Sequence, residues 1–193
     1  MKALWVVLGV VGLIVIVLLM GFGSYVSAKN QMVAKDQDVQ AAFSQIDVDL
    51  QRRADLIPNL VATVKGYANV EETVLTNIAN ARAGLMTAQT PDEKLAANDR
   101  LSVALLPLTR LQENYPQLKS NDQFMRLEDE LAGTENRIAV SRTRYNAAIR
   151  DYNTFIEQFP NSIYAGYAGF HPKTEYYTAD PGAKTAPKVD FSK

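Results

Sequence analysis

Residues 3–28 have the sequence ALWVVLGVVGLIVIVLLMGFGSYVSA and contain no charged side chain. A helix needs about 20 apolar residues to cross the ~30 Å hydrocarbon core of a bilayer. The run is long enough, and Trp5 and Tyr25 stand near its two ends, where aromatic side chains favour the membrane interface. The sequence therefore predicts a transmembrane anchor in residues 1–28, with residues 3–24 in contact with the lipid bilayer.

A cleaved signal peptide is the alternative for this segment, because residues 26–28 (VSA) resemble a small-residue cleavage site. The apolar part of a signal peptide usually covers only about 7–15 residues, which favours an anchor. Orientation follows the basic residues beside the span. Lys2 precedes it, and Lys29 and Lys35 follow it. These charges leave both orientations open, and between them we favour the extracytoplasmic side for the rest of the chain.

The composition excludes several classes of function. The 193 residues include 20 Lys or Arg and 21 Asp or Glu, so the chain lacks the basic excess that nucleic-acid binding needs. The absence of cysteine excludes disulfides, cysteine-ligated metal sites and an acylated lipoprotein anchor. His171 is the single histidine, too few for the paired ligands of a di-iron bundle, and no serine stands in a nucleophile elbow. We therefore predict no enzyme, no metal site and no cofactor.

Helical periodicity dominates the region after the anchor. One stripe of apolar or small residues at 3,4 spacing predicts a long helix that packs in a bundle or coiled coil. Its members are Phe124, Leu127, Leu131, Thr134, Ile138, Ser141, Tyr145, Ala148, Tyr152, Phe155 and Phe159. Ser120 with Gln123 is the predicted capping box at its start, and Pro160 is its predicted end.

A second stripe with the same period predicts a first helix that continues directly out of the anchor. Its members are Val39, Phe43, Ile46, Leu50, Ile57, Val61 and Val64. Two shorter helices lie between the long ones. The first is predicted over residues 70–86. The second begins at residues 90–93 (TPDE), where Thr90 fits the N-cap and Glu93 completes a capping box, and it ends before Pro116. Its stripe is Leu95, Leu101, Leu105, Leu108 and Leu111.

These segments predict an all-α fold: an N-terminal transmembrane helix followed by an antiparallel, elongated four-helix bundle over residues 29–160. Pro58 and Pro107 fall inside helices and predict kinks, because an interior proline removes a backbone hydrogen bond; a break at residues 55–58 is the alternative. Residues 161–193 are predicted to be an irregular aromatic segment that packs over the end of the bundle, followed from Thr178 by a disordered tail.

Polar residues flank the stripes of the first and last helices. They are Arg52, Arg53, Asp55 and Asn59 on the first helix and Glu128, Glu135, Arg142 and Asn146 on the last. Three interpretations stay open. They form local surface pairs worth about a few tenths of a kcal/mol, or an interhelical network in which Arg52 or Arg53 meets Glu128 or Glu135 and fixes the helix register, or a patch that binds another molecule.

Several motifs resemble the LemA family. They are residues 45–61 (QIDVDLQRRADLIPNLV), 113–119 (ENYPQLK) with Phe124, 135–139 (ENRIA), Arg142, 145–146 (YN) and 159–160 (FP). The resemblance covers nearly the whole chain. Phe43 departs from it, since the family often carries tryptophan there, but an aromatic residue is kept. The resemblance implies a bacterial inner-membrane protein with a helical-bundle domain. It implies no activity, because the biochemical role of the family is unsettled.

We therefore expect a membrane-anchored helical scaffold or adaptor that acts through contacts with protein partners or with copies of itself. The long amphipathic helices and the lack of a catalytic constellation support this hypothesis. A membrane-tethered ligand-sensing domain is the alternative, and it requires a pocket between helices. The sequence leaves the molecular activity, the partner, the oligomeric state, the topology and the cleavage of the anchor open.

Overall fold

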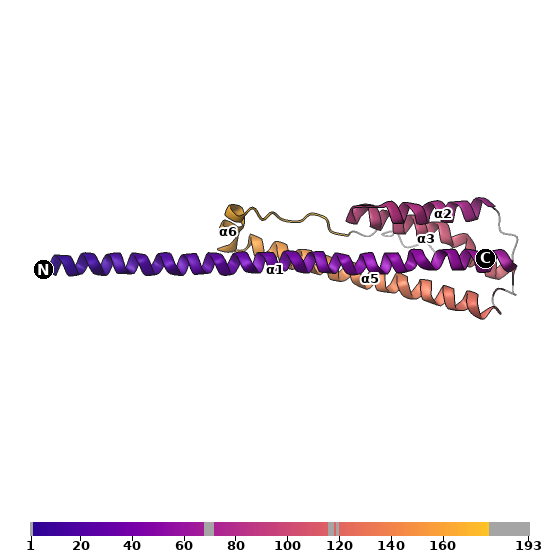
Figure 1. Cartoon of the computed structure of the whole chain (residues 1–193), viewed down its shortest axis with the longest axis horizontal. Helices are drawn as coiled ribbons and strands as arrows, with labels where there is room; N and C mark the ends of the chain where they lie inside the picture. The colour runs from indigo at the N-terminus through magenta and orange to yellow at the C-terminus, as the bar shows by residue number, and fades with distance from the viewer. Residues whose placement is uncertain (1, 68–71, 116–117, 119, 178–193) are drawn as a thin grey trace, which may run out of the picture.

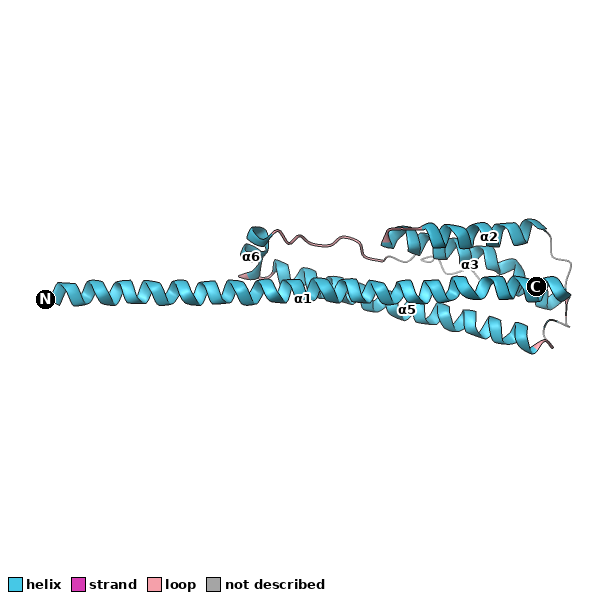
Figure 2. Ribbon diagram, viewed as in Figure 1, coloured by secondary structure: helices cyan, strands magenta, loops and turns pink. Residues whose placement is uncertain are grey.

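The computed structural model describes residues 2–67, 72–115, 118 and 120–177. Over these residues the chain consists of helices and the loops that join them, with no strand (Figure 2). The helices are α1 (Lys2–Tyr67), α2 (Glu72–Thr87), α3 (Pro91–Asn114), α5 (Asp122–Glu157) and α6 (Asn161–Ala168) (Figure 1). The predicted all-α fold is confirmed. The predicted disordered tail lies outside the described residues.

The first helix, α1, is a single helix of 66 residues that joins the apolar run to the bundle. Its N-terminal part projects alone from the bundle (Figure 1), and its apolar side chains are exposed, as Leu13 is at 64%. By length and composition, this is the one helix of the described residues able to cross a membrane. From Lys29 to Tyr67 the helix extends for about 60 Å, at 1.5 Å per residue. The prediction that the apolar run continues into the first bundle helix without a break is confirmed.

The two interior prolines do not interrupt their helices. Pro58 lies inside α1 and Pro107 inside α3, so the alternative of a break at residues 55–58 is wrong, while the kinks stay predictions. Pro58 has no N–H to donate to the carbonyl four residues earlier, which belongs to Ala54. Arg82 of α2 replaces that donor, because its Nε donates to the Ala54 oxygen at 2.8 Å. The carbonyl that Pro58 leaves unpaired therefore binds a side chain of α2 and helps to hold α2 against α1.

The core lies between α1 and α5, which pack antiparallel along the length of the bundle, while α2 and α3 form a shorter hairpin beside the C-terminal half of α1 (Figure 1). Most residues of the predicted stripes are buried in this core or packed against it. Phe159 is 81% exposed, and the side chain of Leu111 lies outside the described part of the structure. Among the described residues, no Cα atom of α3 lies within 8 Å of one of α5. The four-helix bundle is thus open along one seam.

The helix caps follow the predictions in one case and depart from them in another. At the start of α3, Glu93 accepts from the backbone N–H of Thr90 at 3.1 Å and donates its own N–H to the Thr90 hydroxyl at 3.3 Å, as a capping box requires. At the start of α5 the predicted Ser120 cap is wrong. Asn121 is the N-cap, and its Oδ1 accepts from the N–H of Phe124 at 2.8 Å. An asparagine at this position caps as well as serine does.

The segment predicted to be irregular contains a short helix. The preceding helix, α5, ends at Glu157 and Pro160 stands at the N-cap of α6, so the predicted stop at this proline is confirmed. Helix α6 packs against α1 and α5 at the end of the bundle nearest the apolar run (Figure 1). There Tyr164 meets Tyr25 edge to face, with ring centroids 5.6 Å apart.

Residues 170–177 follow α6 as an extended segment that we call the C-terminal strap. Gly169 ends α6 with a φ of 77°, a left-handed conformation that glycine adopts without strain. The strap then runs back along the bundle (Figure 1), with Phe170 packed against the core and Lys173 paired with Asp36 of α1 at 2.8 Å. The C-terminal strap therefore covers the part of the α1–α5 pair that α2 and α3 do not reach.

Candidate functional site

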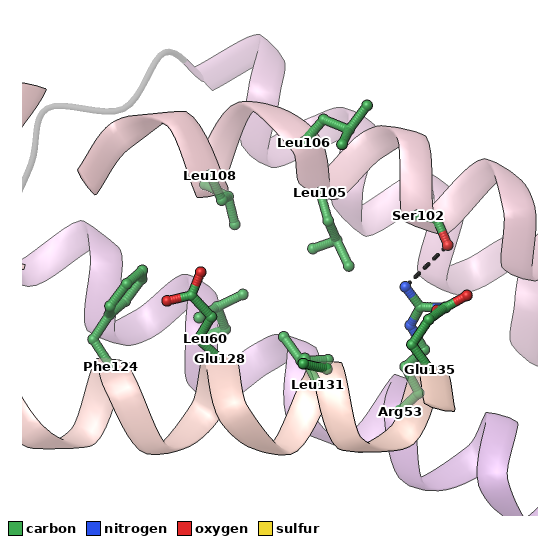
Figure 3. A pocket seen from close by; sticks show the side chains of 11 residues that line it. Arg53, Leu60, Ser102, Leu105, Leu106, Leu108, Phe124, Glu128, Leu131 and Glu135 are labelled. Carbon is green, nitrogen blue, oxygen red and sulfur yellow. Dashed lines mark hydrogen bonds and ion pairs between the residues drawn. The ribbon is translucent and has the colours of Figure 1, made fainter. Parts of the chain in front are cut away.

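Arg53 is a buried cation in the middle of the bundle, only 5% exposed. Its guanidinium forms an ion pair with Glu135 of α5. It also donates to Asn98 Oδ1 at 2.6 Å and to Ser102 Oγ at 3.0 Å, both on α3. Figure 3 shows Arg53 between Ser102 and Glu135, so this one side chain joins three helices across the open seam.

Burial controls the electrostatics of this group. It lowers the pKa of Arg53, because a poorly solvated site disfavours the charged form, and the negative charge of Glu135 opposes that shift. The side chain of Glu135 is 45% exposed, so its carboxylate lies between the buried guanidinium of Arg53 and solvent. Within the described part of the chain, Arg53 Nε and Asn98 Nδ2 are buried donors without a hydrogen-bond partner. Such donors are rare in folded proteins.

Arg142 forms a second polar centre on α5. Its Nη2 lies 3.1 Å from Oδ1 of Asp99 on α3. It also donates to the Tyr177 hydroxyl, and its guanidinium lies 4.0 Å from the centroid of the Tyr177 ring. Burial raises the pKa of Tyr177, and the positive charge of Arg142 opposes that shift. Arg142 therefore joins α5 to both α3 and the end of the C-terminal strap.

Two asparagines of α5 hold the C-terminal strap through its backbone. Asn146 donates to the Tyr177 carbonyl and accepts from the Tyr177 N–H, both at 2.8 Å. Asn153 does the same with Lys173, at 2.7 and 2.8 Å. A side-chain amide carries one acceptor and two donors, so it matches one residue of extended backbone. The two asparagines lie two helical turns apart, and together they fix the strap along α5.

The other predicted residues lie at the surface or beside the cavity. Arg52 pairs with Glu130 at 3.6 Å, and both side chains are at least half exposed. Asp55 accepts from Gln51 on the same helix at 2.9 Å. Asn59 is exposed, and Glu128 lines the cavity described below. Of the predicted candidates, the structure thus brings Arg53 and Glu135 together directly, while Arg142 and Asn146 of α5 both bind Tyr177 of the C-terminal strap.

The sequence analysis did not identify the residues that bind the two arginines, which are Asn98, Ser102 and Asp99 on α3 and Tyr177 in the C-terminal strap. For Arg53 on α1 and Asn98 on α3, the sequence does contain a signal. Arg53 stands between Leu50 and Ile57 where the α1 stripe lacks its next member, and Asn98 stands between Leu95 and Leu101 on α3 in the same way. A polar residue at a core position of an amphipathic helix indicates a buried partner on another helix.

An elongated cavity of about 360 Å³ opens in the seam between α3 and α5, with α1 as its floor (Figure 3). Most of its lining is apolar. The apolar members include Leu60, Leu105, Leu106, Leu108, Phe124 and Leu131. Arg53, Ser102 and Glu135 stand at one end and Glu128 beside Leu60 and Phe124 (Figure 3). A molecule with an apolar body and one polar group matches this distribution.

Among the described residues, no cluster of three or more His, Asp or Glu side chains could hold a metal ion. The polar centres around Arg53 and Arg142 are built from ion pairs and hydrogen bonds.

Similar proteins carry related sequences. The chain is 28% identical over 182 residues to Magnetosome protein MamQ 2 of Paramagnetospirillum magneticum, which covers 81% of this chain and 66% of that protein. It is 27% identical over 182 residues to Magnetosome protein MamQ of Magnetospirillum gryphiswaldense, with the same coverage. It is 28% identical over 145 residues to Protein LemA of Metamycoplasma hominis, covering 72% of this chain and 61% of that protein.

The chain thus spans about two thirds or less of the length of these relatives. A family model also matches most of this chain. The model described as "LemA family" matches residues 42–191, which include α2, α3, α5, α6, the C-terminal strap and the part of α1 that carries Arg53. This chain therefore belongs to the LemA family.

Proposed function

We propose that this protein is a membrane-anchored helical scaffold that acts through protein–protein contacts at the bacterial inner membrane, with its bundle on the extracytoplasmic side. The continuity of α1 carries the proposal, because one helix of 66 residues includes both the apolar run and a row of buried core residues between Met32 and Val64. A continuous helix of this kind sets the height of the bundle above the bilayer. Two curated relatives are named as magnetosome proteins, which is in keeping with a role at a membrane.

The contact surface that suits a partner lies on α1 and α5. Val48 of α1 is 61% exposed and Val140 of α5 is 51% exposed. A shallow hollow of about 280 Å³ lies beside Val140 and is lined by α1 and α5 residues that include Gln45, Asn136 and Arg144. Apolar side chains rimmed by polar and charged ones are typical of a protein interface. The partner is then another protein or a second copy of this chain.

Position-specific crosslinking in native membranes tests the scaffold. A photoreactive amino acid replaces Val48 or Val140, and the matched control replaces Val103, which is equally exposed at 66% but lies on α3. We expect the same product, a defined heteromer or a dimer, from positions 48 and 140, and little of it from position 103. A monomer at every position, or equal products at all three, would contradict the scaffold proposal.

A second candidate function is ligand sensing, which the cavity between α3 and α5 favours. The cavity is large enough for a small amphiphile, and Arg53, Ser102 and Glu135 form its polar end (Figure 3). The neutral amphiphile 4-butylphenol is a suitable probe. Binding should raise the unfolding temperature of the full chain, and above the Kd the stabilisation should grow with the logarithm of the probe concentration.

Filling the cavity supplies the control for that second candidate. Leu105→Trp should remove the stabilisation by 4-butylphenol, since Leu105 is buried and lines the cavity. Val103→Trp, at an exposed position of the same helix, should leave it intact. Equal responses of the two variants would show that the probe binds elsewhere and would rule out a sensing role for this cavity.

A further inference from the structure

Helix α6 lies directly beside the point where the apolar run ends. Side chains of the run are exposed, and the first buried residues that follow are Ala28 and Met32, at 5% and 0%. The Tyr25 ring meets Tyr164 of α6 at 5.6 Å. Tyr25 is three residues beyond Phe22, which corresponds to about 4.5 Å along the helix axis. There is thus no spacer between the apolar run and the bundle, and α6 stands at the boundary between them.

The outer surface of α6 is apolar although it faces solvent. Ile163 is 50% exposed and Tyr167 is 85% exposed, and they lie one turn apart on the same side of the helix. Phe159, just before the helix, is 81% exposed. In addition, residues 158–172 contain no Asp, Glu, Lys or Arg. The opposite side is held in the fold, since Ala165 is buried at 4%.

Resting on the membrane anchoring proposed above, we propose that α6 is a second membrane contact: a short interfacial helix that places Phe159, Ile163 and Tyr167 among the lipid headgroups beside the span. Two observations select lipid as the occupant. The patch is continuous with the lipid-facing surface of α1 through the Tyr25–Tyr164 contact. Its residue types, Phe, Ile and Tyr without charges, are those that favour the headgroup region of a bilayer.

A second contact would fix the tilt of the bundle. A single helix can rotate and tilt in the bilayer, whereas a helix held by two separate points is restricted. The C-terminal strap keeps α6 in place, because Asn153 and Lys173 bind each other through two hydrogen bonds and Lys173 also pairs with Asp36 of α1. The strap and α6 therefore hold the membrane-facing end of the bundle as one unit.

Spin labelling tests the inference in the full chain, which contains no cysteine. Single variants Leu13→Cys, Tyr167→Cys and Val103→Cys are labelled with a nitroxide in vesicles of phosphatidylcholine and phosphatidylglycerol. Collision rates are measured with oxygen, which concentrates in lipid, and with a water-soluble nickel chelate. Ile163→Cys provides an independent position on α6. All four positions are exposed, so the labels should not disturb the core.

We expect position 13 to collide mainly with oxygen and position 103 mainly with nickel, with positions 163 and 167 clearly between them. Labels on α6 that match position 103 would overturn the inference while position 13 still shows the anchor. Labels on α6 protected from both reagents would also overturn it, because they would show burial against protein. If position 13 itself matched position 103, the anchoring proposal would fail, and the interfacial helix with it.

Discussion

The ion pair between Arg53 and Glu135 is the interaction whose removal tests the buried network most directly. Arg53→Met keeps a long side chain of similar shape but removes the cation, and Glu135→Gln removes the charge of its partner. The two single variants and the double variant form a thermodynamic cycle, which isolates the energy of the pair from the other effects of each substitution. Arg53→Met also leaves Asn98 and Ser102 without the guanidinium that they now bind.

Exposure sets the expected size of the coupling. Breaking a fully buried ion pair costs about 3–5 kcal/mol, while exposed pairs contribute about 0–1 kcal/mol. The Arg53 side chain is 6% exposed and that of Glu135 is 45% exposed, so solvent screens one partner only. We therefore expect a coupling energy of about 1–2 kcal/mol. Arg53→Met alone should cost about 2–4 kcal/mol, because two polar partners on α3 also lose their hydrogen bonds.

Urea unfolding of the full chain in lipid nanodiscs, followed by far-UV circular dichroism, measures these energies. The surface pair Arg52–Glu130 supplies a matched cycle on the same two helices, with side chains 58% and 50% exposed. Its variants Arg52→Met and Glu130→Gln should couple by less than about 0.5 kcal/mol. A coupling energy at Arg53–Glu135 no larger than that of this control would refute the reasoning that burial strengthens the ion pair between α1 and α5.

Three further predictions concern single groups. Arg82→Met should destabilise the bundle by about 1–2 kcal/mol in urea titration, because it leaves the Ala54 carbonyl unpaired. The loss should be smaller in a Pro58→Ala background, because alanine at position 58 would supply a backbone N–H to that carbonyl. Burial raises the pKa of Tyr145 to about 12. The neutral Tyr145 side chain therefore contributes its full share of stability below the unfolded pKa near 10, and this share is lost as the pH rises towards 12. The free energy of unfolding measured across this range should fall less steeply in Tyr145→Phe. Asn121→Ala should cost about 1 kcal/mol of stability through the lost N-cap, and Ser120→Ala should cost less in the same denaturant assay.

Much of the architecture followed from local patterns. The long apolar run, the 3,4 spacing along α1 and α5, and the capping box at Thr90 each depend on neighbouring residues in one helix, and these predictions match the structure. The Ser120 cap was wrong because two adjacent residues can both cap a helix, and only the backbone geometry selects Asn121. The helix α6 was missed because eight residues are too few for a clear period.

The sequence by itself determined that this protein has one long apolar helix followed by amphipathic helices. A helix long enough to span lipid needs an uninterrupted apolar run, and a helix with one buried face needs apolar residues at 3,4 spacing. Only the tertiary structure decided which polar groups meet. Arg53 binds Asn98, 45 residues away, and Asn146 binds Tyr177, 31 residues away. Such pairs depend on how each helix is rotated about its axis and on how closely its neighbours approach. Those quantities are set by packing of the whole bundle, and no single helix encodes them.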